Sequence, residues 1–279
     1  MKLYFLIFLV LLSRVVFAQS EFKNYHDNGK LKTQGWYDEK NKQTGEWKIY
    51  HENGELKVIG TFANGFKTGE WKTYHKNGKL AEIGKFEDGN MSGEWKFYNE
   101  NGSLLKGGNY FGKSNSILNI KHGEWRYYFP NGKLNEAGAY RNDEKEGIWK
   151  TYYGNGQLSK IGKYKSGNQV DIWKEYYENG QLKAEGSFIE TDDDEPALPG
   201  YDKKGTWKYY YQDGKLEGVE HFDDWGKRTG EYKAFHSNGK VKYTGFFNHN
   251  GRQQGEWKTY SETGDLIKSE KYENGKKVE

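Results

Sequence analysis

The sequence contains no cysteine and only three prolines among its 279 residues. The lack of cysteine excludes a disulfide framework, cysteine-ligated zinc and thiol catalysis. Leucine, isoleucine, valine and phenylalanine are also scarce, with 51 residues in total, and such a low content often accompanies disorder. A net charge of only +3, with 10 Trp, 23 Tyr and 15 Phe residues, argues against disorder here. Aromatic side chains, at roughly 150–250 Å² each, must therefore supply most of the buried area.

Residues 1–18 have the pattern of a secretory signal peptide. Lys2 is followed by an uncharged apolar run from Leu3 to Leu12, and Val16 to Ala18 place small residues before a cleavage point. The run is too short for a transmembrane helix, which needs about 20 residues. We expect export to the periplasm, the cell surface or the medium, with no membrane span in the mature chain. A short anchor that stays attached is the alternative.

The remainder, residues 19–279, consists of one repeated motif, G-x-W-K-x-Y-x-x-N-G-x-L-x-x-x-G-x-[YF]. Two longer spacings mark insertions near 111–122 and 189–204, and no separate catalytic domain has room. The ten copies start at Ser20, Gly45, Gly69, Gly93, Gly123, Gly147, Asp171, Gly205, Gly230 and Gly255. The first aromatic column is Phe22, Trp47, Trp71, Trp95, Trp125, Trp149, Trp173, Trp207, Tyr232 and Trp257.

Each copy is predicted to form a β-hairpin, because Asn-Gly between aromatic or β-branched runs is a strong hairpin signal. A type I′ turn at Asn53-Gly54 would pair Tyr50 with Lys57 and Trp47 with Gly60, so that a large ring faces a bare backbone. Trp207 and Trp257 would face Glu220 and Glu270 instead, which predicts looser packing near the C-terminus. The expected Trp–Gly pairs are Trp47–Gly60, Trp71–Gly84, Trp95–Gly108, Trp125–Gly138, Trp149–Gly162 and Trp173–Gly186.

Side chains alternate across a strand, so the second face should carry a ladder of tyrosine flanked by lysine and glutamate. Such a ladder is a hypothetical site for a glycan, an anion or a peptide. The alternative is that the tyrosines only cover the sheet, with lysine stems over them. The ladder residues are Tyr50, Lys48, Tyr74, Lys72, Tyr98, Lys96, Tyr128 and Arg126. Short turn-rich linkers predict an all-β, elongated antiparallel meander of about ten hairpins that neighbours must stabilise by stacking.

Candidates for chemistry are few. His26, His51, His75 and His236 follow the repeat, which favours a turn-flanking role over metal ligation or base catalysis. The acidic run 191–195 has oxygen ligands for Ca²⁺ but lacks the spacing of a calcium loop, which favours a solvated loop. The glycine-rich turns precede no helix pattern, so no phosphate loop, cofactor or metal is predicted. With 43 basic and 40 acidic residues, a nucleic-acid partner is not expected either.

At G-E-W-K-x-Y-x-x-N-G-x-L-x-x-x-G-x-F the sequence resembles the MORN-repeat variant, and more closely the bacterial YwqK-type antitoxin family. The resemblance covers Ser20 to the C-terminus and implies a non-enzymatic ribbon of hairpins that binds proteins or membranes. We therefore expect an exported, non-catalytic repeat scaffold that binds a protein or an envelope component. A toxin-neutralising protein and a cell-wall or glycan binder that uses the ladder are the alternatives.

The apolar run and the residues that follow it generate a prediction about processing. Signal peptidase cuts after small residues, so the exported protein should begin at Gln19. N-terminal sequencing of the protein from the culture medium or envelope checks this. Recovery of the uncut chain in the cytoplasm would contradict it.

Overall fold

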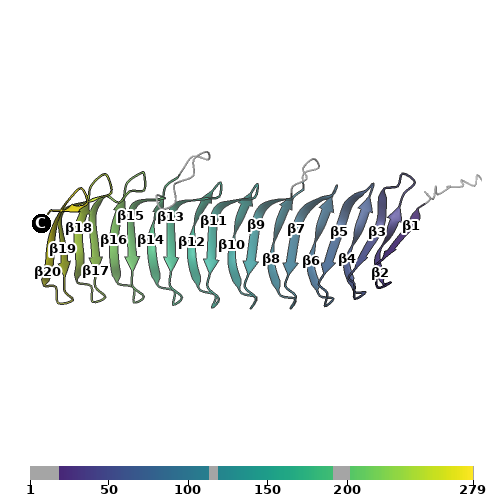
Figure 1. The fold of residues 1–279 in the computed structure, drawn as a ribbon, viewed down its shortest axis with the longest axis horizontal. Helices are drawn as coiled ribbons and strands as arrows, with labels where there is room; N and C mark the ends of the chain where they lie inside the picture. The colour runs from purple at the N-terminus through teal and green to yellow at the C-terminus, as the bar shows by residue number, and fades with distance from the viewer. Residues whose placement is uncertain (1–18, 113–118, 191–201, 279) are drawn as a thin grey trace, which may run out of the picture.

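A computed structural model describes residues 19–112, 119–190 and 202–278, which form one open antiparallel sheet. Each strand pairs with the next along the chain, giving ten hairpins and a short final strand (Figure 1). The strands are β1 (Ser20–Tyr25), β2 (Leu31–Tyr37), β3 (Gln43–Tyr50), β4 (Leu56–Ala63), β5 (Phe66–Tyr74), β6 (Leu80–Glu87), β7 (Asn90–Tyr98), β8 (Leu104–Phe111), β9 (Ile120–Tyr128), β10 (Leu134–Arg141), β11 (Glu144–Tyr152), β12 (Leu158–Lys165), β13 (Asn168–Tyr176), β14 (Leu182–Phe188), β15 (Lys203–Tyr210), β16 (Leu216–Phe222), β17 (Gly230–Phe235), β18 (Val241–Phe247), β19 (Gln253–Tyr260), β20 (Leu266–Glu273) and β21 (Lys276–Lys277).

The predicted all-β meander is confirmed. Figure 1 shows an elongated ribbon with β1 at one end and β20 at the other. The described ranges contain no helix, and therefore none that could cross a membrane. The expected signal peptide at 1–18 and the acidic run at 191–195 lie outside the described residues.

The register within each hairpin follows the prediction except next to the turn. Trp47 pairs with Gly60 as expected, but Tyr50 pairs with Leu56 and not with Lys57, because the register shifts between Ile49 and Tyr50. The other five expected Trp–Gly pairs also form. The predicted type I′ turn is therefore wrong, since it allows no such shift.

The turn itself explains the shift. The Gly54 N–H donates to the His51 carbonyl at 2.9 Å, and the His51 N–H donates to the Glu55 carbonyl at 2.8 Å. Gly54 has a φ of 91°, whereas Asn53 does not have a positive φ. This is the geometry of a type I turn followed by a left-handed glycine, which forms a bulge. The Asn53 side chain instead accepts the Glu55 N–H at 3.0 Å, as asparagine does in an Asx turn.

Each glycine of the Trp–Gly pairs makes room for the tryptophan of the following hairpin, not for the one it is paired with. A Cβ on Gly60 would lie 2.1 Å from the Trp71 ring, and one on Gly84 would lie 2.1 Å from the Trp95 ring. The same clash links Gly35 to Trp47, Gly108 to Trp125, Gly138 to Trp149, Gly162 to Trp173, Gly186 to Trp207 and Gly245 to Trp257. From Trp71 to Trp207 the indole N–H donates to the next carbonyl of that neighbour, for example from Trp95 to Lys85 at 3.2 Å. The Trp47 N–H donates instead to Thr44 in its own strand, and the buried Trp257 N–H has no partner within the described residues.

The contact between a glycine and the tryptophan of the following hairpin accounts for both residues of the first aromatic column that are not tryptophan. Tyr232 replaces tryptophan where the preceding hairpin has Glu220 in place of glycine, and Phe22 lies in the first hairpin of the described residues. Glu270 lies in the tenth hairpin, and no indole of the described residues lies over it. The expected loose packing of Trp207 is wrong, since this ring is only 3% exposed. The weakest strand pairing lies between the eighth and ninth hairpins, where β16 and β17 pair through only two residues of each strand.

A chain of edge-to-face ring contacts runs along the tryptophan face. Phe62 lies between Trp47 and Trp71, with ring centroids 5.6 and 5.1 Å away. Equivalent contacts continue to Trp207, and they resume from Tyr232 to Tyr272. The seven indoles from Trp47 to Trp207 are 0 to 5% exposed, so this single-layer sheet builds its core from one face.

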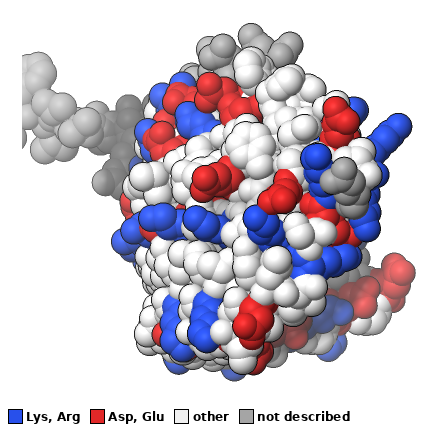
Figure 2. All heavy atoms as spheres, turned by 90° about the vertical axis from the view of Figure 1, so that its left-hand side faces the viewer, with Lys and Arg blue, Asp and Glu red and all other residues white. Residues whose placement is uncertain are grey.

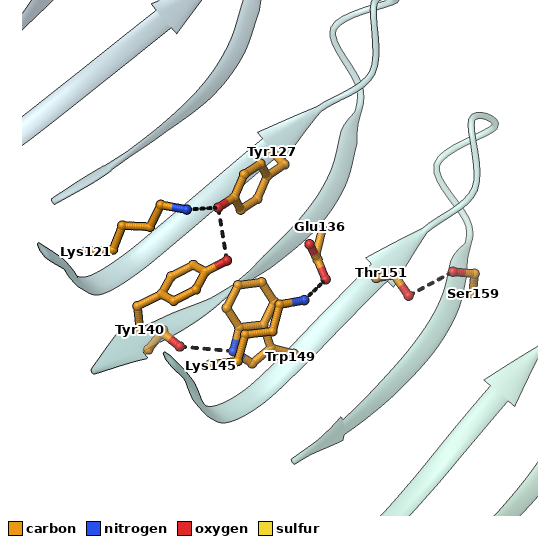
Figure 3. Close-up of polar contacts among 9 residues, drawn as sticks. Lys121, Tyr127, Glu136, Tyr140, Lys145, Trp149, Thr151 and Ser159 are labelled. Carbon is orange, nitrogen blue, oxygen red and sulfur yellow. Dashed lines mark hydrogen bonds and ion pairs between the residues drawn. The ribbon is translucent and has the colours of Figure 1, made fainter. Parts of the chain in front are cut away.

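The strands bend where the indole approaches. Between β4 and β5 the pairing is interrupted after Ile59, and Gly69 opposite has a φ of 66°. A bulge with a left-handed glycine bends a strand and increases its twist. The bend recurs in successive hairpins, and the strands are curved along the whole ribbon (Figure 1). Tyr140 and Trp149 lie on the concave side of these strands (Figure 3), so the tryptophan side is the inner face of the ribbon.

The Trp–Gly contact generates a stability prediction. Gly84→Ala should lower the free energy of unfolding by about 3 kcal/mol, the upper range for overpacking, because the buried Trp95 ring has nowhere to move. Gly154→Ala is the matched control, since nothing lies within 4 Å of its Cβ position and its φ is not positive. Urea denaturation followed by tryptophan fluorescence measures both. Equal effects of the two substitutions would contradict the rule.

Candidate functional site

The inner face combines a constant aromatic floor with side chains that differ from hairpin to hairpin. We call the glycine that pairs with the first-column aromatic the floor glycine; Glu220 and Glu270 take its place in the eighth and tenth hairpins. Three positions surround each ring: four residues before the first-column aromatic, two residues after it, and two residues before the floor glycine. From the second to the tenth hairpin the first position holds Gln43, Lys67, Met91, Lys121, Lys145, Gln169, Lys203, Arg228 and Gln253. The second holds Ile49, Thr73, Phe97, Tyr127, Thr151, Glu175, Tyr209, Ala234 and Thr259, and the third holds Val58, Glu82, Lys106, Glu136, Lys160, Ala184, Gly218, Tyr243 and Lys268.

Hollows open on this face. One, of about 430 Å³, is lined by Ile49, Val58 and Thr73 above the rings of Trp47 and Trp71. Another, of about 390 Å³, lies near the C-terminal end, where Glu220, Arg228 and Tyr232 interrupt the row of indoles. The inner face is therefore a shallow groove that crosses the strands.

Lysines in this groove lie over the rings of the floor. The Nζ atom of Lys145 is 4.0 Å from the centre of the Trp149 ring, and that of Lys67 is 4.4 Å from Trp71. A cation over an aromatic face is attracted by the ring quadrupole. Burial lowers the pKa of Lys67 and of Lys121, as expected when a charged amine loses solvent.

Figure 3 shows the polar contacts at the centre of the groove. The Tyr127 hydroxyl lies 3.1 Å from the Tyr140 hydroxyl and receives a hydrogen bond from Lys121 at 3.4 Å. Burial, with the Tyr140 hydrogen bond, raises the pKa of Tyr127, so this phenol stays protonated at neutral pH. Lys145 pairs with the carboxylate of Glu136. These groups are fixed hydrogen-bond donors and charges, a property suited to recognition.

The ladder predicted on the opposite face has its charges neutralised. Lys48 and Lys72 each lie 2.7 Å from a glutamate two residues earlier on the same strand, which raises the pKa of both lysines. Lys96 and Arg126 have equivalent partners at 3.3 and 3.9 Å. The ladder tyrosines Tyr50, Tyr74, Tyr98 and Tyr128 are half-buried. Binding by the ladder stays a prediction.

The repeated histidines link neighbouring hairpins. The Nε2 atoms of His26, His51 and His75 lie 3.0, 2.9 and 2.9 Å from the backbone carbonyls of Tyr50, Tyr74 and Tyr98. A carbonyl only accepts, so each Nε2 carries the hydrogen. Tyr153, Tyr177 and Tyr211 take the same position and donate through their hydroxyls. Over the described ranges, no three His, Asp or Glu side chains gather as a metal site would require.

Sequence reasoning missed the inner-face positions as candidates for binding. It treated the tryptophan side as packed and therefore closed, whereas a single-layer sheet leaves that side open to solvent. The signal was present in the repeat itself, because the position four residues before the tryptophan varies among Gln, Lys and Met while the tryptophan is kept. A position that varies around constant neighbours is free to serve recognition.

Comparison with known proteins gives a family but no close relative. The model for the MORN repeat variant matches residues 19–39, 43–64, 67–88, 91–110, 121–142, 145–166, 172–190, 203–224, 228–249 and 253–274. No curated protein matches significantly. Among solved structures, the crystal structure of TcdB2-TccC3-TEV is 11% identical with a TM-score of 0.18, and the Photorhabdus luminescens Tc holotoxin pore is 11% identical with a TM-score of 0.19. Each alignment covers 92% of this chain and 15% of the other, and such scores carry no inference. The ten matches cover most of the sequence, so the chain belongs to the MORN repeat variant family.

Proposed function

We propose that this MORN-repeat protein is an exported, non-catalytic scaffold that binds a partner protein along its inner groove. The fold supports a binding role in general, because a ribbon of hairpins offers an extended surface that a partner can follow. Export is proposed from the signal-peptide pattern of residues 1–18. The periplasm, the cell surface and the medium are the compartments that this pattern allows.

One observation carries the proposal: the groove separates residues that fold the chain from residues that differ between hairpins. The indoles are buried and constant, while the side chains above them include apolar, hydroxyl, acidic and basic groups. Such a surface presents a different set of contacts at each hairpin, and many weak contacts in a row give affinity and register.

The non-catalytic part of the proposal rests on how the acidic groups are used. Glu175 pairs with Lys160 at 3.1 Å, and Glu220 pairs with Arg228 at 3.1 Å. Glu136 is held by Lys145 in the same way. A general acid or base needs to reach a substrate proton, whereas each of these carboxylates is already engaged by a cation of the protein.

A protein partner is favoured over a sugar chain on this face. Sugar recognition uses exposed aromatic faces as stacking platforms, but the indoles of Trp47 to Trp207 are covered by neighbouring strands and lysines. Hydroxyls, amides and charges remain accessible above them. A glycan or envelope polymer would therefore have to use the ladder on the opposite face.

Neighbouring residues on opposite faces provide the test. A photo-crosslinking amino acid at Thr73 reports on the inner groove, and one at Lys72 reports on the ladder. In the native envelope, we expect crosslinks to one defined protein from Thr73 and none from Lys72. Crosslinks from Lys72 alone would transfer the function to the ladder, and crosslinks from neither position would contradict a scaffold that binds a protein partner.

A further inference from the structure

The centre of the groove gathers three lysines from neighbouring strands. We define the central lysine patch as Lys106 on β8, Lys121 on β9 and Lys145 on β11. Lys106 pairs across the strands with Tyr127, whose hydroxyl accepts a hydrogen bond from Lys121. Lys106 and Lys145 each act electrostatically on Lys121. Among the groove positions of β8 to β11, Glu136 is the one acid that faces them, and it pairs with Lys145. Asp143 also acts on Lys121 and accepts its backbone N–H at 2.8 Å.

Most other cations of the groove have a matched acid. Lys160 pairs with Glu175 and Arg228 with Glu220, while Glu82 acts on Lys67. Lys203 is the single groove cation of β15, where it donates to the Tyr209 hydroxyl at 2.8 Å. Lys121 and Lys106 lie instead over rings, 4.8 Å from the centre of Tyr140 and 4.7 Å from that of Phe97. Like charges gathered on a half-buried aromatic floor cost stability, and an anion would relieve that cost.

We infer that the central lysine patch binds an extended acidic segment of a partner protein. This inference rests on the proposed function and specifies the chemistry of the partner. The charge complementarity is supported by donors in place, since Lys121 and the Tyr127 and Tyr140 hydroxyls form one hydrogen-bonded group. Carboxylates accept strong, charge-assisted hydrogen bonds from such groups.

The geometry favours a single chain over a membrane surface. Figure 3 shows Lys121, Tyr127 and Lys145 on the inner side of the bent strands, and the Lys145 side chain is only 25% exposed. A flat bilayer cannot follow the inside of this bend, whereas one extended chain fits along it. The patch therefore binds carboxylates brought in by a peptide.

The repeat also sets the spacing of those carboxylates. Lys121 and Lys145 hold the same position in successive hairpins, which lie about 9.6 Å apart at two strand spacings of about 4.8 Å. An extended chain advances about 3.3 Å per residue. Acidic residues at every third position would therefore meet Lys121 and Lys145 in turn.

The probe is a fluorescent twelve-residue peptide with glutamate at every third position and serine elsewhere. Its control has the same composition with the glutamates in one block. Fluorescence anisotropy with the chain from Gln19 should show tighter binding of the spaced peptide. Lys121→Gln should weaken that binding about tenfold, while Lys48→Gln on the opposite face should leave it unchanged.

Thermal melting separates this inference from a general effect on folding. Lys121→Gln should raise the Tm of the free protein, because it removes a half-buried positive charge that is repelled by Lys106 and Lys145. The same substitution should reduce the increase in Tm that the spaced peptide produces. Equal binding of both peptides, no effect of Lys121→Gln on binding, or a lower Tm of the free variant would overturn the inference. Lys121-dependent binding to phosphatidylserine vesicles would also overturn it. If crosslinks from Thr73 persist in any of these cases, the proposed scaffold function stands and only the acidic partner is lost.

Discussion

The structure depends on one contact, in which an indole ring lies flat over the bare backbone of a glycine in the preceding hairpin. The contact is directional, because a hairpin with this glycine gives space to the indole of the next hairpin and not to its own. It buries a large apolar ring without a second layer of structure, and from Trp71 to Trp207 the indole N–H is satisfied by a carbonyl of the same neighbour. A chain with few aliphatic residues can therefore fold as a single sheet, since the core is assembled between hairpins and not within them.

The same contact determines where function can reside. Floor rings and turn residues are fixed by packing and by the hydrogen bonds between hairpins, so they cannot change without loss of stability. The positions around each ring are not constrained in this way, and the residues that differ between hairpins lie at these positions. Charge follows from this division, because acids and bases in the groove can be placed hairpin by hairpin while the opposite face keeps its repeated Glu–Lys pairs.

The fold could be predicted from the sequence because its signals recur in every hairpin. The register of Trp47 with Gly60 followed from counting back from Asn-Gly, and a wrong turn type changed only the pairs beside the turn. Counting within one hairpin could not reveal which ring occupies the space above Gly60, since that contact joins two hairpins. The groove was missed for a related reason. The bend that forms it comes from the glycine that opens the motif, such as Gly69, and from the sequence this glycine is considered only as the partner of an aromatic ring and not as a residue with a left-handed φ.

The tenth hairpin differs from the others at the positions that join one hairpin to the next. Glu270, Ser261 and Thr263 stand there in place of the floor glycine, the carbonyl-binding His or Tyr, and the turn asparagine. Ser261 turns back to its own loop and accepts the Asp265 N–H at 3.0 Å. Figure 2 looks onto this end and shows basic and acidic side chains interspersed among uncharged ones. Glu270 takes the place of the glycine, and its carboxylate pairs with Lys268 on β20 at 2.9 Å and with Lys277 on β21 at 3.0 Å. The position that elsewhere lies under an indole is therefore held by ion pairs with lysines of two neighbouring strands.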